Sequence, residues 1–341
     1  MKSMQAPKTM PAANSAALAT LREMTAMSGS LRHAGILCAC AVLACAAAPP
    51  CFSQPMREKP DRALQERLDG VIHGFRGDVG LYVRHLGSGR SAAIRADETF
   101  PTASLIKVPI LLAVFDAIGR GQLDYHASLE YDASLLYPGE DILGAFKSGA
   151  RISLSKLVML MITTSDNTAS LWLQTLAGGG GAINLWLEHN GFRHTRVNSR
   201  TAGREKDYEA TGWGQTTPRE MAELLVMIRA GRAVNGAASE EMYRILTRIY
   251  YDGEALSQLP PWVQAASKQG AVDRSRSEVV LVNAPSGDYV FCVITKNQAD
   301  ESWNPDNEGF VLLRKVSALL WQHFEPGRPW SPAAGAERLK P

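Results

Sequence analysis

The sequence has too few cysteines beyond its first residues to build a disulfide framework. Four of the five, Cys38, Cys40, Cys45 and Cys51, lie within the first 51 residues, and Cys292 is the fifth. Small disulfide-rich folds need an even set of cysteines in the mature domain, so that class is excluded. Cys292 lies in the apolar run 289–294, which predicts a buried structural thiol rather than a nucleophile.

The sequence also lacks a strong excess of positive charge and histidine spacings typical of metal sites. The net charge is +2, charged residues make up 21% of the chain, and no run of lysine or arginine forms a basic tract. Nucleic-acid binding normally needs such a tract, so we expect no nucleic-acid partner. The seven histidines show no H-E-x-x-H spacing, and His189 and His194 stand five apart in a predicted loop. We therefore expect neither a metal nor another cofactor.

The apolar stretch near the N-terminus is too short to span a bilayer. It covers residues 34–48, follows Arg32 and His33, and ends in small residues. A membrane span needs about 20 apolar residues, whereas this pattern is typical of a secretory signal. Residues 1–53 are therefore predicted to be the export segment of a periplasmic or secreted protein without a stable membrane span.

Two details of this segment have alternatives. The region before the apolar stretch is long for a signal, so translation from Met24 or Met27 would give a conventional one. Val42-Leu43-Ala44-Cys45 resembles a bacterial lipoprotein box. Lipidation of Cys45 is therefore an alternative to simple cleavage after Ala48 or Ser53.

Hydrophobic patterning predicts strands at both ends of the remaining chain, with helices between them. A hydrophobic fraction of 45% suffices for a sizeable core. Alternation and turn residues predict strands at 78–86, 90–94, 278–282 and 289–295. Helical spacing and capping residues predict helices at 104–118, 153–163, 217–230 and 309–324, followed by a disordered tail over 326–341. The expected fold is α/β, with an antiparallel sheet assembled from distant segments and flanked by helices.

Ser104-Leu105-Ile106-Lys107 places a hydroxyl and an amine three residues apart at the start of an apolar helical stretch. Positions i and i+3 share a helix face, so a neutral Lys107 amine can accept the proton of the Ser104 hydroxyl. This spacing predicts a serine nucleophile that needs no histidine.

Two further motifs follow in order. Ser165-Asp166-Asn167 comes sixty-one positions after Ser104, and Lys268-Gln269-Gly270 precedes the second predicted hairpin. From about residue 61 to residue 324 the chain resembles the class A serine β-lactamases and their penicillin-binding relatives, whose motifs are S-x-x-K, S-D-N and K-T-G. The resemblance implies one hydrolase domain at 54–325, with an α/β lobe (about 60–100 and 216–325) and a helical lobe (about 101–215).

The resemblance also implies roles in acyl transfer. Ser104 is the nucleophile, and its N–H and that of Ala271 donate to the oxyanion. Lys107 is the base, because a second cation, Lys268, lowers its pKa. Ser165 relays a proton to the leaving nitrogen.

The remaining implied roles concern substrate binding and the loop that carries the second motif. Asn167 holds a substrate amide, and Lys268, Gln269 and Gly270 form the binding strand. Lys268 binds a carboxylate together with Arg274 or Arg276; the spacing leaves both open, and Arg276 is preferred. Asp166 is expected to be a buried brace for its loop.

The chain departs from the family pattern at two places. Gln269 stands where the family has threonine or serine, so one hydroxyl donor is lost. The family's E-x-x-L-N pattern, whose glutamate activates the deacylating water, is missing from 199–215. Counting back from the helix start places Thr201 at the glutamate position, with three carboxylates nearby: Glu205, Asp207 and Glu209. Glu205 is the preferred substitute.

Three functions remain possible. The first is acyl-serine hydrolysis of a small-molecule β-lactam. The second is a peptidase or esterase acting on cell-wall-like or small acyl substrates, favoured by the altered third motif. The third is a binding or sensing protein that stays acylated by β-lactams, because loss of a general base slows turnover by about 10²- to 10⁴-fold.

Overall fold

The main sheet joins the two ends of the described chain. The computed structural model describes residues 57–139 and 141–341. Six strands lie in the order β1-β3-β2-β11-β10-β9, and both predicted hairpins, β2–β3 and β10–β11, are confirmed. The bounds are β1 Lys59–Pro60, β2 Asp78–His85, β3 Arg90–Ile94, β9 Ala265–Val272, β10 Ser275–Val282 and β11 Tyr289–Lys296. β1 and β3 run parallel, and all other neighbours are antiparallel.

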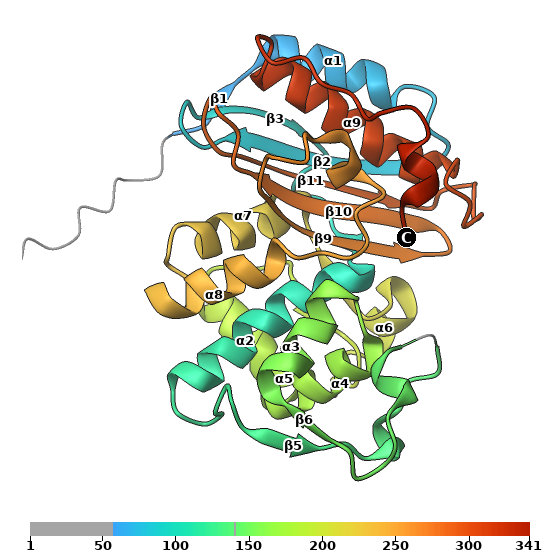
Figure 1. Cartoon of the computed structure of the whole chain (residues 1–341). Helices are drawn as coiled ribbons and strands as arrows, with labels where there is room; N and C mark the ends of the chain where they lie inside the picture. The colour runs from blue at the N-terminus through green and yellow to red at the C-terminus, as the bar shows by residue number, and fades with distance from the viewer. Residues whose placement is uncertain (1–56, 140) are drawn as a thin grey trace, which may run out of the picture. The chain divides into compact units, whose positions relative to one another are not determined.

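Helices cover both faces of this sheet. Figure 1 shows α1 (Arg62–Ile72) and α9 (Glu308–Phe324) side by side on one face, where they enclose one hydrophobic core. On the other face α7 (Pro218–Arg229) contacts β2, β10 and β11, and α8 (Gly236–Leu246) packs beside it. The predicted cap of α7 is confirmed, because the Thr217 side chain accepts from the Glu220 N–H and proline follows at the first helical position.

The helical lobe is built around α2 (Lys107–Gly119). Ten residues of α2 are buried, and the helix contacts α3, α4, α5 and α8, which agrees with its nearly continuous apolar sequence. The other helices of this lobe are α3 Leu154–Thr163, α4 Asn167–Leu176, α5 Gly179–His189 and α6 Glu205–Thr211. The predicted cap of α3 is present, since Ser153 accepts from the Lys156 N–H. The predicted helix at 104–118 differs at its start, where a 3₁₀ turn, η1 (Ala103–Ile106), precedes α2.

Short elements complete the domain. Three strands form a small sheet in the order β4-β8-β7, and β5 pairs with β6. Their bounds are β4 Phe100–Pro101, β5 Ser128–Glu130, β6 Arg151–Ser153, β7 Arg196–Val197 and β8 Gly214–Thr216. The 3₁₀ turns are η2 Ala133–Leu135, η3 Leu143–Ala145, η4 Ala255–Gln258 and η5 Ala336–Leu339. The β4–β8 pair lies directly before η1 and helps to position it.

The C-terminal segment corrects one prediction. Residues 326–341 were expected to be disordered, but Trp330 packs on the core under α1 and α9, and the segment ends in η5. The Arg328 carbonyl accepts from Trp321 Nε1 at 2.9 Å, and Lys340 Nζ lies 2.8 Å from Asp252 Oδ2. One tryptophan and one ion pair thus hold a stretch whose composition resembles a flexible tail.

Several other predictions concern burial and the N-terminal region. Cys292 is fully buried, and burial raises the pKa of its thiol, as expected for a structural residue. Within 57–139 and 141–341, none of the helices combines the length and apolar character needed to cross a bilayer. The predicted export segment, including Cys45, lies outside the described residues.

Candidate active site

A tight backbone turn presents Ser104. Ala103 has a φ of +43°, a conformation that is uncommon for a residue with a Cβ. The turn is held by two backbone bonds, from the Thr102 N–H to the Gly214 carbonyl at 3.0 Å and from the Leu105 N–H to the Thr102 carbonyl at 2.9 Å. Side chains at i and i+3 eclipse in a 3₁₀ turn. The geometry of η1 therefore directs Ser104 and Lys107 to the same side.

The Lys107 amine lies at the centre of a polar network. Its Nζ donates to Ser104 Oγ at 3.1 Å, Ser165 Oγ at 3.0 Å and Asn167 Oδ1 at 2.7 Å, and also to the Ser165 carbonyl. Ser165 has a φ of +57°, again in the left-handed region. The S-x-x-K and S-D-N motifs thus meet at one amine, with strained backbone on both sides, as is common at functional sites.

Lys268 is the second amine that contacts Ser165. Its Nζ donates to Ser165 Oγ at 3.1 Å, to the Gln269 carbonyl at 2.9 Å and to Gln269 Oε1 at 3.1 Å. The Ser165 hydroxyl therefore lies between the amines of Lys107 and Lys268. A hydroxyl in this position can pass a proton between one amine and a bound substrate.

Burial brings both amines toward their neutral forms. Lys107 and Lys268 are each 0% exposed, and a charged amine loses its hydration there. Burial lowers the pKa of Lys107 to about 7, against the charges of Asp141 and Asp166, which raise it. Burial, followed by the charge of Lys107, lowers the pKa of Lys268 well below its usual range. Burial, rather than the charge of Lys268 that the sequence suggested, is thus what lowers the pKa of Lys107, and it makes a neutral amine available near pH 7.

Asp166 is the buried brace that its position predicted. It is 1% exposed and accepts from the Leu143 N–H at 2.8 Å and from the Ala169 N–H at 2.7 Å. The second bond caps α4, and the first ties α4 to the segment around η3. Asp166 therefore holds the loop that carries Ser165 and Asn167.

Gly270 lets strand β9 lie directly against the nucleophile. A Cβ at this position would be 2.8 Å from the Thr102 carbonyl oxygen and 2.9 Å from the Ser104 nitrogen. No side chain fits between these two backbone segments. The next residue, Ala271, therefore reaches the same cavity wall as Ser104.

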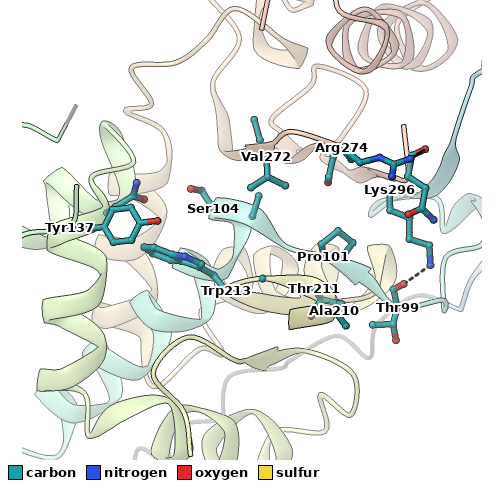
Figure 2. A pocket seen from close by; sticks show the side chains of 16 residues that line it. Thr99, Pro101, Ser104, Tyr137, Ala210, Thr211, Trp213, Val272, Arg274 and Lys296 are labelled. Atoms are coloured by element: carbon teal, nitrogen blue, oxygen red, sulfur yellow. Dashed lines mark hydrogen bonds between the residues drawn. The ribbon is translucent and has the colours of Figure 1, made fainter. Parts of the chain in front are cut away.

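The cavity beside Ser104 has a volume of about 650 Å³ and two chemically different ends. Figure 2 shows Tyr137 and Trp213 at one end, close to Ser104, and Arg274 and Lys296 at the other. Asn167 and Ala271 also line the cavity. Among the described residues that line it there is no aspartate or glutamate. Nor do the described residues contain a cluster of three or more histidine, cysteine or acidic side chains that could hold a metal ion.

This arrangement agrees with comparisons to known proteins. The family model described as "Beta-lactamase enzyme family" matches residues 63–324. The chain belongs to the beta-lactamase enzyme family. β-Lactamase VEB-1 of Pseudomonas aeruginosa is 21% identical over 274 residues, which cover 76% of this chain and 90% of that protein. The sequence relationship is distant but extends over nearly the whole relative.

Solved structures show the same fold for this serine β-lactamase-like hydrolase. PBP-A is 27% identical with a TM-score of 0.72, and the match covers 80% of this chain and 100% of that one. A mutant of PBP-A, solved as an acyl-enzyme complex with penicillin G, is 28% identical with a TM-score of 0.71, covering 79% and 99%. The predicted sheet with an added helical lobe is thus the fold of the family.

The structure does not bring Glu205 to the active site of this hydrolase. Glu205 is exposed at the start of α6, and its Oε1 accepts from the Gly203 N–H at 3.1 Å. Its side chain is not part of the cavity wall; that stretch of wall is formed by residues 210–213. Thr201 is displaced as well, because it packs against Gly180. The preference for Glu205 as deacylating base is therefore corrected: α6 turns its N-terminus toward solvent and only its C-terminal end toward the cavity.

Arg276 also differs from its predicted role. Its guanidinium donates to the carbonyls of Val272, Ser275 (3.0 Å) and Ser302 (2.7 Å). It is fully buried and lies over the rings of two aromatic residues. The other candidate, Arg274, is the one that lines the cavity. The preference for Arg276 is corrected because these carbonyl oxygens hold its guanidinium, whereas Arg274, in the turn before β10, lines the cavity.

Sequence reasoning missed the two aromatic residues of the cavity. Tyr137 precedes residue 140, in a stretch without a regular pattern, and Trp213 lies in the loop between α6 and β8. Their ring centroids are 5.1 Å apart with an angle of 85° between the planes. The available signal was an aromatic residue just before the Thr216-Thr217-Pro218 helix start, in the loop searched for a carboxylate.

Proposed function

We propose that this hydrolase opens β-lactam rings by acylating Ser104 and then hydrolyses the acyl-enzyme slowly. The observation that carries the first part is the 3.1 Å contact between Ser104 Oγ and the buried Lys107 amine at the cavity wall. The second part rests on the absence of an acidic side chain from the described residues that line the cavity. The acyl-enzyme of the related PBP-A mutant with penicillin G supports the same substrate class.

Acylation follows from the positions of the two amines. Neutral Lys107 takes the proton of Ser104 Oγ, which attacks the lactam carbonyl carbon. The N–H groups of Ser104 and Ala271 stabilise the oxyanion that forms. The carbon–nitrogen bond breaks as Ser165 gives its proton to the nitrogen and is reprotonated by the neighbouring amine of Lys107 or Lys268. The product is an ester on Ser104.

The experiment mixes purified protein with a chromogenic cephalosporin and follows product release together with intact mass. We expect a stoichiometric burst, one adduct on Ser104, and slow continuing turnover. The S104A variant is the control and should form no adduct. Absence of both adduct and turnover in the wild-type protein would contradict the proposal and favour the peptidase or esterase alternative.

Replacing Glu205 by glutamine should leave turnover unchanged. The carboxylate is exposed, and a general base must lie within hydrogen-bond reach of its water. Steady-state hydrolysis of the chromogenic substrate is the measurement, with E209Q as a matched variant on the same helix. A fall of tenfold or more in E205Q alone would show that the loop rearranges and delivers Glu205 to the ester.

The acylation rate should rise with pH and level off above about pH 7. Lys107 must be neutral to accept the Ser104 proton, and burial lowers its pKa to about 7. Below that pH the neutral fraction, and with it the rate, falls about tenfold per unit. Rapid mixing with penicillin G from pH 5 to 9 measures this profile. A rate that is constant from pH 5 to 8 would exclude Lys107 as the base.

Substitutions of Arg274 and Arg276 should have separate effects. We expect R274A to weaken apparent affinity for β-lactams that carry a carboxylate, with unchanged stability, because Arg274 lines the cavity and its side chain is 59% exposed.

R276A removes buried bonds from a charged donor, and bonds of that kind contribute about 1.5–3 kcal/mol each. We expect R276A to lower the free energy of unfolding by at least the contribution of one such bond, about 1.5–3 kcal/mol. Denaturant titration and acylation kinetics of both variants test this; equal stability losses would contradict it.

A further inference from the structure

One aromatic side chain covers the catalytic amine on the cavity side. The Trp213 ring lies 5.9 Å from Lys107 Nζ, lines the cavity with Ser104, and meets the Tyr137 ring edge to face (Figure 2). Lys107 itself has no exposed surface although its partner Ser104 lines the cavity. The indole is therefore part of what separates Lys107 from solvent.

The backbone holds Trp213 in a fixed place relative to the nucleophile. The Trp213 carbonyl accepts from the N–H groups of Asn198 at 2.9 Å and Ser199 at 3.0 Å. The following residue, Gly214, bonds to Thr102, and a Cβ on Gly214 would be 2.5 Å from the Ile106 side chain. Strand β8 is thus packed tightly against η1. The backbone that carries the indole therefore cannot move away from the nucleophile unless η1 moves too.

The ring is chemically inert toward hydrolysis. An indole can donate a hydrogen bond through Nε1 but has no group that accepts a proton. No carboxylate or imidazole is present among the described cavity-lining residues. We take Lys107, whose Nζ lies 3.1 Å from Ser104 Oγ, as the base for a hydrolytic water. A water molecule must therefore reach the ester carbonyl within range of Lys107 Nζ, and the centroid of the Trp213 ring lies 5.9 Å from that atom.

We propose that Trp213 is a positioning residue that keeps water from Lys107 and from the ester on Ser104, and so prolongs the acyl-enzyme. This inference rests on the proposed acylation of Ser104. In the step that Trp213 slows, the water oxygen bonds to the acyl carbon and the bond from that carbon to Ser104 Oγ breaks. The proton of the water passes to neutral Lys107 and then to Oγ, which restores the free serine.

The charged and hydrogen-bonding groups that act on Lys107 all lie on residues other than Trp213. Asp166 and Asp141 act on Lys107 from the α4 side, and Lys268 acts from strand β9. Ser104, Ser165 and Asn167 are its hydrogen-bond partners. None of these groups would change in a Trp213 variant. A shift of the pH profile to higher pH in such a variant would therefore report the entry of water, because loss of the attraction between the ring and the charged amine would shift it to lower pH.

The experiment measures the lifetime of the penicillin G adduct by intact mass after excess ligand is removed. We expect W213A to shorten the lifetime of the adduct by about tenfold or more. The effect should be smaller than the 10²- to 10⁴-fold that a positioned base contributes. W213F keeps a ring and should stay close to the wild type. The control is W262A, which removes a tryptophan that is 76% exposed and outside the active-site cavity, and should change nothing. In W213A the acidic limb of acylation should also move to higher pH, because hydration favours charged Lys107.

Each other outcome counts against the proposal. A folded W213A whose adduct persists as long as the wild-type adduct overturns it. A folded W213A that is no longer acylated shows that the ring serves acylation instead. A W213F adduct as short-lived as the W213A adduct shows that an aromatic ring at this position is not a barrier to water. If W213A does not fold, an unchanged lifetime in Trp213→Leu overturns the inference. A wild-type protein that forms no adduct removes the proposed function and this inference together.

Discussion

Replacing Lys107 by methionine is expected to slow acylation of Ser104 by about 10²- to 10⁴-fold, the contribution of a positioned general base. Methionine nearly matches the buried lysine in length but cannot take the proton of Ser104 Oγ, the atom that lies 3.1 Å from Nζ. Acylation of K107M should be slow at every pH. Acylation of the wild-type protein should slow only in acid, where Lys107 is protonated. Intact-mass kinetics with penicillin G measure the second-order rate constant.

The matched control for this variant is K147M. Lys147 is exposed in the same lobe, and surface substitutions usually change the free energy of unfolding by less than about 0.5 kcal/mol. Thermal unfolding of both variants separates a loss of chemistry from a loss of fold. Acylation of folded K107M at the wild-type rate would show that Lys268 or another group is the base.

Substituting Gly270 by alanine should have the second-largest effect. The new Cβ would lie 2.8 Å from the Thr102 carbonyl oxygen, 2.9 Å from the Ser104 nitrogen and 2.8 Å from Ser277 Oγ. Two of these are backbone atoms, so β9 and η1 must move apart. Separation displaces the N–H of Ala271 from that of Ser104, and loss of one oxyanion donor costs about 10²- to 10³-fold in rate. Acylation kinetics of G270A measure this.

A glycine with open space around it provides the comparison. A Cβ at Gly70, within α1, meets nothing within 4 Å, and alanine in a helix is favoured over glycine by about 1 kcal/mol. We expect G70A to keep full activity and gain some stability. If G270A reacts as fast as G70A, the close contact of β9 with η1 is not needed for catalysis.

Local sequence patterns predicted the elements that carry the chemistry. The i, i+3 spacing of Ser104 and Lys107 holds in the 3₁₀ turn as well as it would in a helix, because both geometries place these side chains on one side. The cap at Thr217 and the two strand–turn–strand patterns that form β2–β3 and β10–β11 depend on neighbours in the chain. For this reason the sequence was sufficient for them.

The assignments that needed distant contacts were less successful. Counting residues from Pro218 could not place Glu205, because the direction of α6 depends on how its loop packs against the domain. Arg274 and Arg276 differ by two positions, and the tight turn at 273–274 decided which of them lines the cavity. Composition predicted disorder after 325, yet Trp330 packs onto a core formed by residues far away in the chain.

The sequence by itself determined the motif set, the two hairpins at the ends of the domain with helices between them, and the serine chemistry, because these follow from spacing along the chain and from side-chain type. Only the tertiary structure decided that the hydroxyl of Ser165 contacts two buried amines, and that the indole of Trp213 lies beside the nucleophile. The reason is physical: the pKa of an amine and the access of water depend on which distant segments exclude solvent, and such burial arises only when the lobes pack together.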